Sequence, residues 1–287
     1  MDLGDQSAEP LAESAQLALQ LAQRYCHGCD WYHGAWQYLR LAGVTASFDA
    51  CKPFLQRVLS ELAARSGFEQ ILISGSADYA MLAAILDAWD VSAHRPITTM
   101  VDICRTPLEL NAWYANRRSV ALSTYQADIR SFRPAEHFDL ICTHSFLGLF
   151  DAADRQRVVE SWARCLRPGG LVVTTQRVRP DAIAERVAYS REQVQAFEAR
   201  AKERAQSMGD LPGLPAGALA PLARAYAEHK QTYVIRSAGE LRSLFERNGF
   251  AVEEQEQSGA AEHAADRLAG PPDISSERIR IVARKLR

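Results

Sequence analysis

The chain has 287 residues, of which 47% are hydrophobic and 24% are charged, and its formal net charge is −2. This composition is that of an ordinary folded protein and excludes global disorder. The near-neutral charge provides no basic field for nucleic acid or an anionic membrane surface, and no apolar run reaches the roughly 18 residues that span a bilayer. We therefore expect neither a nucleic-acid partner nor a membrane partner.

The N-terminal segment and the cysteines bear on location. The first ten residues read M-D-L-G-D-Q-S-A-E-P, which is acidic and lacks the charged-then-apolar pattern of an export signal. Six cysteines are scattered through a chain that is long enough to fold without disulfides: Cys26, Cys29, Cys51, Cys104, Cys142 and Cys165. We expect reduced thiols and a cytoplasmic protein.

Residues 1–67 are predicted to form a helical cap, because apolar residues keep helical spacing and no strand pattern occurs. Within it, Cys26, His27, Cys29 and His33 lie close together in sequence. A structural zinc site needs four ligands, usually supplied as two separated pairs. The sequence shows no second Cys/His pair at a fitting distance, so we predict no metal.

Aromatic residues are dense in the same segment, at Trp31, Tyr32, His33, Trp36 and Tyr38. One interpretation is a lid in which Tyr32 and Trp36 cover a ligand. The other is that these rings pack the helical segment onto the rest of the molecule. The sequence leaves both open.

The stretch from Gln70 to Trp89 predicts a buried strand that runs through a glycine turn into a helix. Ile71 to Ile73 form the apolar run, Gly75 ends it, and helical spacing begins at Ala77. Such a turn exposes backbone N–H groups at a helix start, where an anionic group is favoured. By itself the motif also fits an ordinary strand-to-helix connection.

The next 100 residues alternate strand and helix. A second strand ends at Asp102, and Thr106 to Glu109 is typical of a capping box that starts a helix. Further strands are predicted at residues 120–126, 138–143 and 171–176, and Asp151 is predicted to cap the helix before the last of them. This alternation with short connections predicts an α/β fold with a doubly wound, mostly parallel sheet.

The alternation stops between residues 180 and 230, where Ile183 to Ala201 predict a long helix and residues 219–229 another. An insertion of this length is typically a lid or a substrate-binding cap. A second capping box at Ser237 starts a final helix, followed by two strands that are separated by a Gly/Ala/Pro-rich loop from Ser258 to Ser276.

This order of features resembles the class I S-adenosylmethionine (SAM)-dependent methyltransferases over roughly residues 68–287. The matching signals are the turn at Gly75, the acid Asp102, Ala127-Asp128 after the third strand, Phe138 to Ile141, and Leu166 to Gly170. The resemblance implies a Rossmann-like, seven-stranded sheet with an antiparallel last strand. It also implies a two-part chain, with the cap at 1–67 and a SAM-binding domain at 68–287.

The resemblance implies that Asp102 holds the ribose hydroxyls, that Asp128 holds the adenine amino group, and that the turn at Gly75 lies under the methionine portion. The full implied set is Gly75, Ser76, Ala77, Tyr79, Asp102, Ile103, Asp128, Ile129 and Thr143. Asp102 and Asp128 also fit loop or capping roles.

Three positions depart from the family's first motif. Ile73 stands where an acid usually fixes the amino group of SAM, and Ala77 and Tyr79 replace glycines. The departures leave two interpretations open: a modified SAM pose, or a pocket that has lost SAM.

We therefore carry three functional hypotheses. The first is methyl transfer from SAM to an O, N or C nucleophile of a small molecule in biosynthesis, with His144 or His33 as general base because imidazole titrates near neutrality. His144 also fits the role of a core histidine. The second is cyclisation of SAM itself to azetidine-2-carboxylate, with release of methylthioadenosine. The third is a non-catalytic binding protein. The sequence leaves the acceptor and the oligomeric state open, a homodimer included.

Overall fold

We describe the protein from a computed structural model, in which residues 10–45, 48–65, 67–90, 95–215, 217–257 and 276–287 are described. The loop predicted from Ser258 to Ser276 lies outside these ranges except for its last residue. No helix in the described ranges is both long and apolar enough to cross a membrane.

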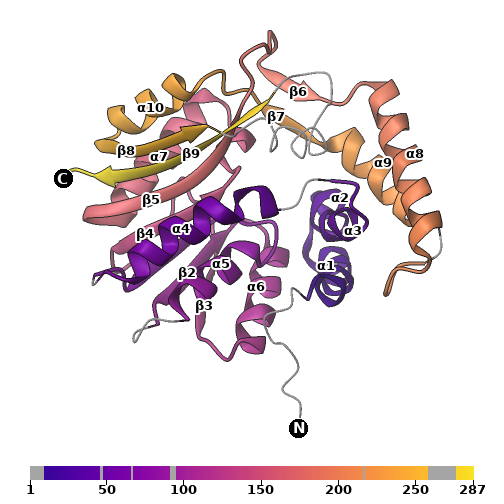
Figure 1. The fold of residues 1–287 in the computed structure, drawn as a ribbon, viewed down its shortest axis with the longest axis horizontal. Coiled ribbons are helices and arrows are strands. Elements are labelled where there is room, and N and C mark those ends of the chain that lie inside the picture. The colour runs from indigo at the N-terminus through magenta and orange to yellow at the C-terminus, as the bar shows by residue number, and fades with distance from the viewer. Residues whose placement is uncertain (1–9, 46–47, 66, 91–94, 216, 258–275) are drawn as a thin grey trace.

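One large sheet has the strand order β3-β2-β1-β4-β5-β9-β8 (Figure 1). Strands β1 to β5 run parallel, and β9 pairs antiparallel with both β5 and β8. The strands are β1 (Gln70–Ser74), β2 (Ile97–Asp102), β3 (Leu122–Gln126), β4 (Phe138–His144), β5 (Leu166–Val178), β8 (Phe250–Gln257) and β9 (Glu277–Lys285). The predicted doubly wound sheet of seven strands with an antiparallel strand is confirmed.

Strand β1 lies in the interior of the sheet, between β2 and β4. Its residues Ile71, Leu72 and Ile73 are fully buried, as a continuous apolar run predicts for a strand covered on both faces. Ile71 and Ile73 belong to the core on one face, whereas Leu72 belongs to the core on the other. The turn at Gly75 therefore follows an interior strand of the sheet that is covered on both faces.

Helices cover both faces. The first core lies under α4 (Lys52–Ala63), α5 (Ala80–Trp89) and α6 (Arg105–Arg117), and the second lies under α7 (Ala152–Cys165) and α10 (Ala238–Arg247). Helix α4, predicted as part of the N-terminal cap, packs on α5 and contributes Leu55 and Leu59 to the first core. The division of the chain at residue 68 stays a prediction.

Helix starts follow the predicted capping residues in two cases of three. Asp151 and Ser237 cap α7 and α10, and each side chain accepts a hydrogen bond from a backbone N–H three residues later. Thr106 does not cap α6, which begins at Arg105. The Thr106 hydroxyl instead donates to the carbonyl of Leu21, at 3.3 Å, because the end of α1 packs against this turn.

A second layer of helices lies beside the carboxyl edge of the sheet (Figure 1). It is built from two separate parts of the chain that share one hydrophobic core, and we call it the cap. The N-terminal arm contains α1 (Leu11–Tyr25), α2 (Asp30–His33) and α3 (Trp36–Leu41). The inserted arm contains β6 (Arg186–Ala188), α8 (Arg191–Met208), α9 (Leu219–His229) and β7 (Gln231–Tyr233). Ile183 is exposed ahead of the inserted helix, which begins later than predicted.

Candidate binding site at the carboxyl edge of the sheet

A cavity of about 540 Å³ lies between the cap and the carboxyl ends of β1 to β4. This volume falls within the roughly 300–1,000 Å³ that small-molecule sites occupy. Its walls are formed by the turns after the parallel strands, by α2 and the start of α3, and by the segment from Tyr226 to Ile235. In a doubly wound sheet this edge is where ligands bind.

The turn after β1 brings Gly75, Ser76 and Ala77 to the cavity wall, as predicted. Gly75 has a φ of 68°, a conformation that favours glycine. A side chain at this position would overlap the ring of Phe146, which follows β4 and also lines the cavity. The glycine is therefore required by the close approach of Phe146 to the backbone.

We expect Gly75→Ala to lower the free energy of unfolding by about 1–3 kcal/mol, through left-handed strain and overlap with Phe146. Thermal or denaturant unfolding measures the effect. Gly148→Ala is the matched control, because Gly148 also lines the cavity but an added Cβ has no neighbour closer than 3.8 Å. Adding Phe146→Ala should restore part of the loss, and equal stability of the two single glycine variants would contradict the prediction.

Asp102 lies at the end of β2 with its carboxylate at the cavity wall. One oxygen accepts a hydrogen bond from the Cys104 N–H at 2.8 Å, and the other accepts one from the Ser76 N–H at 3.3 Å. Burial raises the pKa of Asp102 to about 6, against the opposing effect of these hydrogen bonds. At neutral pH the group is a carboxylate with room to accept further donors. Ile103 beside it also lines the cavity and is exposed.

Asp128 also reaches the cavity wall, with Ile129 buried next to it. Its carboxylate is held by Arg130, at 2.6 Å for the closest pair of atoms, and Arg130 also contacts Asp154. These hydrogen bonds lower the pKa of Asp128. Unlike Asp102, this acid is already paired with a cation.

Two predicted site residues lie outside the cavity lining. The side chain of Tyr79 is buried in the core against α6, where its ring stacks on Tyr114 at a centroid distance of 4.5 Å. Helix α5 begins directly after Tyr79, and the turn directs this ring away from the cavity. Thr143 is fully buried within β4, and its hydroxyl has no hydrogen-bond partner in the described part of the chain.

The two predicted histidines both border the cavity. His144 Nδ1 lies 2.6 Å from the Thr175 hydroxyl, and its Nε2 lies 3.4 Å from the Arg278 guanidinium. Burial, with the Arg278 charge next, holds the pKa of His144 well below its ordinary value. Burial lowers the pKa of His33 to about 4. Both rings are neutral at pH 7, and burial opposes the charged form that a general base must adopt.

Four cationic side chains, which we call the cationic end, line the cavity: Arg177, Arg179, Lys230 and Arg278. The Lys230 ammonium lies 4.7 Å from the centre of the Tyr32 ring. Burial, followed by the charges of Arg177 and Arg179, lowers the pKa of Lys230 to about 8. Sequence reasoning missed this group because its members come from β5 and the turn after it, from the end of α9 and from β9.

The pKa of Lys230 predicts a pH dependence of stability. Its folded value of about 8 lies below its ordinary 10.5. Between these values the unfolded chain binds more protons than the folded one, so this lysine makes stability rise with pH through that window. The groups that face it are Arg177, Arg179, Tyr32 and Tyr226.

We expect Lys230→Met to remove this contribution. Between about pH 7.5 and about pH 9.5, the melting temperature of the native protein should therefore rise more, or fall less, than that of the variant. Thermal melts at the two pH values measure it. Lys202→Met, which replaces an exposed lysine of α8, is the matched control and should follow the native profile. The same pH profile in all three proteins would contradict the prediction.

A buried ion pair ties the N-terminal arm of the cap to the sheet. Asp78, in the turn after β1, accepts a hydrogen bond from Arg40 at 2.6 Å and another from the Trp36 indole at 3.0 Å. Tyr32 and Trp36 stack on each other and on Tyr226 of the inserted arm, and all three line the cavity. These rings therefore both cover the cavity and pack the cap, so the two interpretations of the aromatic segment are compatible.

Comparison with known proteins agrees with this architecture. Residues 83–170 match a family model described as a methyltransferase domain. This segment contains β2, β3, β4 and α7, with the turns that carry Asp102 and Asp128. The chain has the class I methyltransferase fold. The comparison with curated proteins found no match.

Solved structures share this methyltransferase fold at low sequence identity. A SAM-dependent methyltransferase from Clostridium acetobutylicum ATCC 824 is 10% identical with a TM-score of 0.53, over 87% of this chain and 96% of that one. The N-methyltransferase NodS from Bradyrhizobium japonicum WM9, in complex with S-adenosyl-L-homocysteine, is 15% identical with a TM-score of 0.51, over 96% and 99% of the two chains. The [4+2]-cyclase SpnF is 15% identical with a TM-score of 0.51, over 81% and 80%.

Proposed function

We propose that the protein binds SAM in this cavity and transfers its methyl group to a small anionic molecule. Three observations support the use of SAM: the methyltransferase-domain match, the fold, and its similarity to NodS, whose structure holds S-adenosyl-L-homocysteine. The proposal depends most on Asp102. This carboxylate is partly buried at the end of β2 and faces a cavity, as a ribose with two hydroxyl donors requires.

The residues of the cavity fit an adenosyl group in most respects. Asp102 would accept the ribose hydroxyls, Ile103 and Ile129 provide apolar contact for a ring, and the turn at Ser76 and Ala77 is open to the cavity. Asp128 would have to share its oxygens between Arg130 and the adenine amino group. Phe146 lies over Gly75, so the methionine portion would rest against this ring.

The cationic end supports an anionic substrate. Four positive side chains line the cavity there, and a cavity lined by one sign of charge attracts ligands of the opposite sign, such as a carboxylate or phosphate group. Methyl transfer is a displacement at a carbon that positive sulfur already activates, so the protein mainly aligns the two reactants and excludes water. Trp36 would face the sulfonium with its ring, because aromatic rings attract cations, whereas the Tyr32 ring is already in contact with the Lys230 ammonium. Because its pKa is lowered, His144 would line the cavity as a neutral imidazole that forms hydrogen bonds and does not act as a base.

SAM itself carries a carboxylate. Two anionic groups can therefore occupy the cationic end: the carboxylate of SAM or the anionic group of the acceptor. Calorimetry with SAM and with methylthioadenosine, which lacks the amino-acid part, distinguishes them. If the cations hold the methionine carboxylate, Arg278→Leu weakens SAM binding and leaves methylthioadenosine binding unchanged. If they hold the acceptor, as proposed, the variant leaves both affinities unchanged and raises only the acceptor's KM.

A second candidate is cyclisation of SAM. The α-amine would attack the γ-carbon of its own chain, the carbon–sulfur bond would break, methylthioadenosine would leave, and the amine would lose a proton. Three observations favour it. Ile73, at the position where the family has an acid, is buried in the core, and the nearby Asp78 is paired with Arg40. The four cations disfavour an ammonium, so the reactive neutral amine is favoured. SpnF, a cyclase, shares the fold.

One assay separates the candidates. The protein is incubated with methyl-labelled SAM, alone and then with a metabolite extract fractionated by anion exchange. If the label moves to an anionic metabolite that the anion-exchange column retains, with S-adenosylhomocysteine as co-product, the proposal is supported. If methylthioadenosine forms without any acceptor, cyclisation is supported. Unchanged SAM in every fraction would overturn both and leave the non-catalytic hypothesis. The cytoplasmic location and the homodimer stay predictions.

A further inference from the structure

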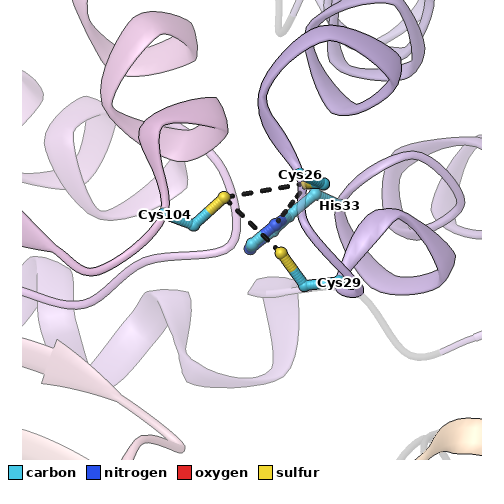
Figure 2. A group of neighbouring side chains, drawn as sticks. All are labelled: Cys26, Cys29, His33 and Cys104. Atoms are coloured by element: carbon cyan, nitrogen blue, oxygen red, sulfur yellow. Dashed lines mark hydrogen bonds between the residues drawn. The ribbon is translucent and has the colours of Figure 1, made fainter.

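Three cysteines and a histidine meet at the boundary between the cap and the sheet (Figure 2), and three of these four residues also line the cavity. We call this group the cysteine–histidine cluster; its members are Cys26, Cys29, His33 and Cys104. Cys26 follows α1, Cys29 precedes α2, and His33 ends α2. Cys104 comes from the turn after β2 and precedes α6. The cluster therefore joins two segments that are more than 70 residues apart in sequence.

Three of the six separations between the ligand atoms are close to those around one tetrahedral ion. The Cys104 sulfur is 3.7 Å from the Cys26 sulfur and 3.6 Å from the Cys29 sulfur. The Cys26 sulfur is 3.4 Å from His33 Nδ1, and all four atoms lie within 4.8 Å of one another. With zinc bonds of about 2.3 Å to sulfur and about 2.0–2.1 Å to nitrogen, tetrahedral geometry gives separations of about 3.8 Å for S···S and about 3.5 Å for S···N.

The sequence-based prediction of no metal depended on the lack of a second Cys/His pair. Cys26 and Cys29 form one pair, and the fold supplies the missing ligands differently. His33 is placed on the same side by the single turn of α2, and Cys104 arrives from the sheet. The lack of a second pair therefore does not exclude a metal site, because three ligands come from one segment and one from another.

We propose that the cysteine–histidine cluster binds one Zn²⁺ as a closed structural site. Three thiolates and an imidazole form one of the usual zinc ligand sets, and soft sulfur ligands exclude Mg²⁺ and Ca²⁺. The Thr106 hydroxyl, which donates to the Leu21 carbonyl, lies 3.3 Å from the Cys26 sulfur and packs against this ligand from outside the site. With four protein ligands, no coordination position is left for a substrate, so the ion stabilises structure and does not take part in catalysis.

The location predicts what the ion does. The turn that carries Cys104 also carries Asp102, and the Asp102 carboxylate accepts a hydrogen bond from the Cys104 N–H. A zinc bond to Cys104 would therefore fix the N-terminal arm of the cap to the wall of the cavity. A disulfide is the competing chemistry, but it would join two sulfurs and leave the third cysteine and the histidine unexplained. A zinc ion at this position would stabilise the cap whichever reaction takes place in the cavity.

Metal analysis of the full-length protein tests the proposal directly. The chain is produced with added zinc, purified under reducing conditions, and analysed by inductively coupled plasma mass spectrometry. We expect about one zinc per chain. Replacement by Co²⁺ should produce an intense visible spectrum with sulfur-to-cobalt charge-transfer bands. Because the ion binds the folded chain, a strong chelator should also lower the melting temperature.

Two variants make the test specific. Cys104→Ser should lower zinc affinity at least 100-fold and weaken the cobalt charge-transfer bands, whereas Cys165→Ser, at the buried last residue of α7, should retain the full zinc content. Circular dichroism confirms that both variants are folded. If Cys104→Ser fails to fold, the chelator and cobalt measurements on the native chain still decide.

Three results would overturn the proposal. The first is reduced, zinc-supplied protein that contains no bound metal. The second is the same zinc content in Cys104→Ser as in the native chain. The third is a disulfide within the cluster, found by mass spectrometry of protein alkylated before reduction. None of these measurements requires SAM or an acceptor, so they do not depend on the proposed function.

Discussion

Asp102→Ala is expected to weaken SAM binding by about 10-fold to 150-fold. In the proposed pose, removing the carboxylate would leave the ribose hydroxyls without a charged acceptor, and such hydrogen bonds contribute about 1.5–3 kcal/mol. The side chain is partly buried and faces the cavity, so water replaces it only in part. Isothermal titration calorimetry with S-adenosylhomocysteine, which does not react, measures the loss.

Asp102→Asn is the companion variant, since the amide keeps one acceptor and should lose less affinity than alanine. Asp87→Ala is the matched control, because Asp87 pairs with Arg118 on the surface of α5 and lies far from the cavity lining. The turn also contains Cys104, so zinc content is measured on each variant. Native affinity in a folded Asp102→Ala protein would contradict the proposed position of the ribose.

Arg40→Met is expected to lower the free energy of unfolding by about 3 kcal/mol, because it leaves the Asp78 carboxylate buried without its cation. The side chains are only 2% and 7% exposed, so solvent screens the pair little. For a chain of this size the loss corresponds to a fall in melting temperature of about 6–12 °C. Thermal unfolding followed by circular dichroism measures it.

The surface pair of Arg224 with Glu228 provides the control. Its side chains are 56% and 43% exposed, so Arg224→Met should cost less than about 0.5 kcal/mol. Adding Asp78→Asn to Arg40→Met should cost less than the sum of the single variants, since the uncompensated charge is then removed. Additive losses would show that Arg40 stabilises the cap by packing alone.

The sheet could be predicted from sequence because its signals are local. Apolar runs such as Ile71 to Ile73 encode buried strands, and the capping residues Asp151 and Ser237 act within three residues of themselves. The position of Asp102 followed from its place at a strand end. Thr106 shows the limit, because a tertiary contact with α1 uses the hydroxyl that its local pattern assigned to a cap.

The rest of the site depends on contacts between distant segments. The cationic end combines Arg177, Lys230 and Arg278 from three parts of the chain, and no local spacing relates them. Cys104 joins its cluster only when α6 packs against α1. Phe146 likewise meets Gly75 only because β1 and β4 are neighbours in the sheet. These features require the tertiary structure.

The shared core of the two cap arms has a consequence for chimeric enzymes. Tyr38 and Leu39 of the N-terminal arm are buried in the same cluster as Phe197 and Tyr226 of the inserted arm. Transplanting one arm alone from a related protein would leave an apolar face of the other without its match. Recombination that aims to change which molecules reach the cavity should therefore exchange both arms together.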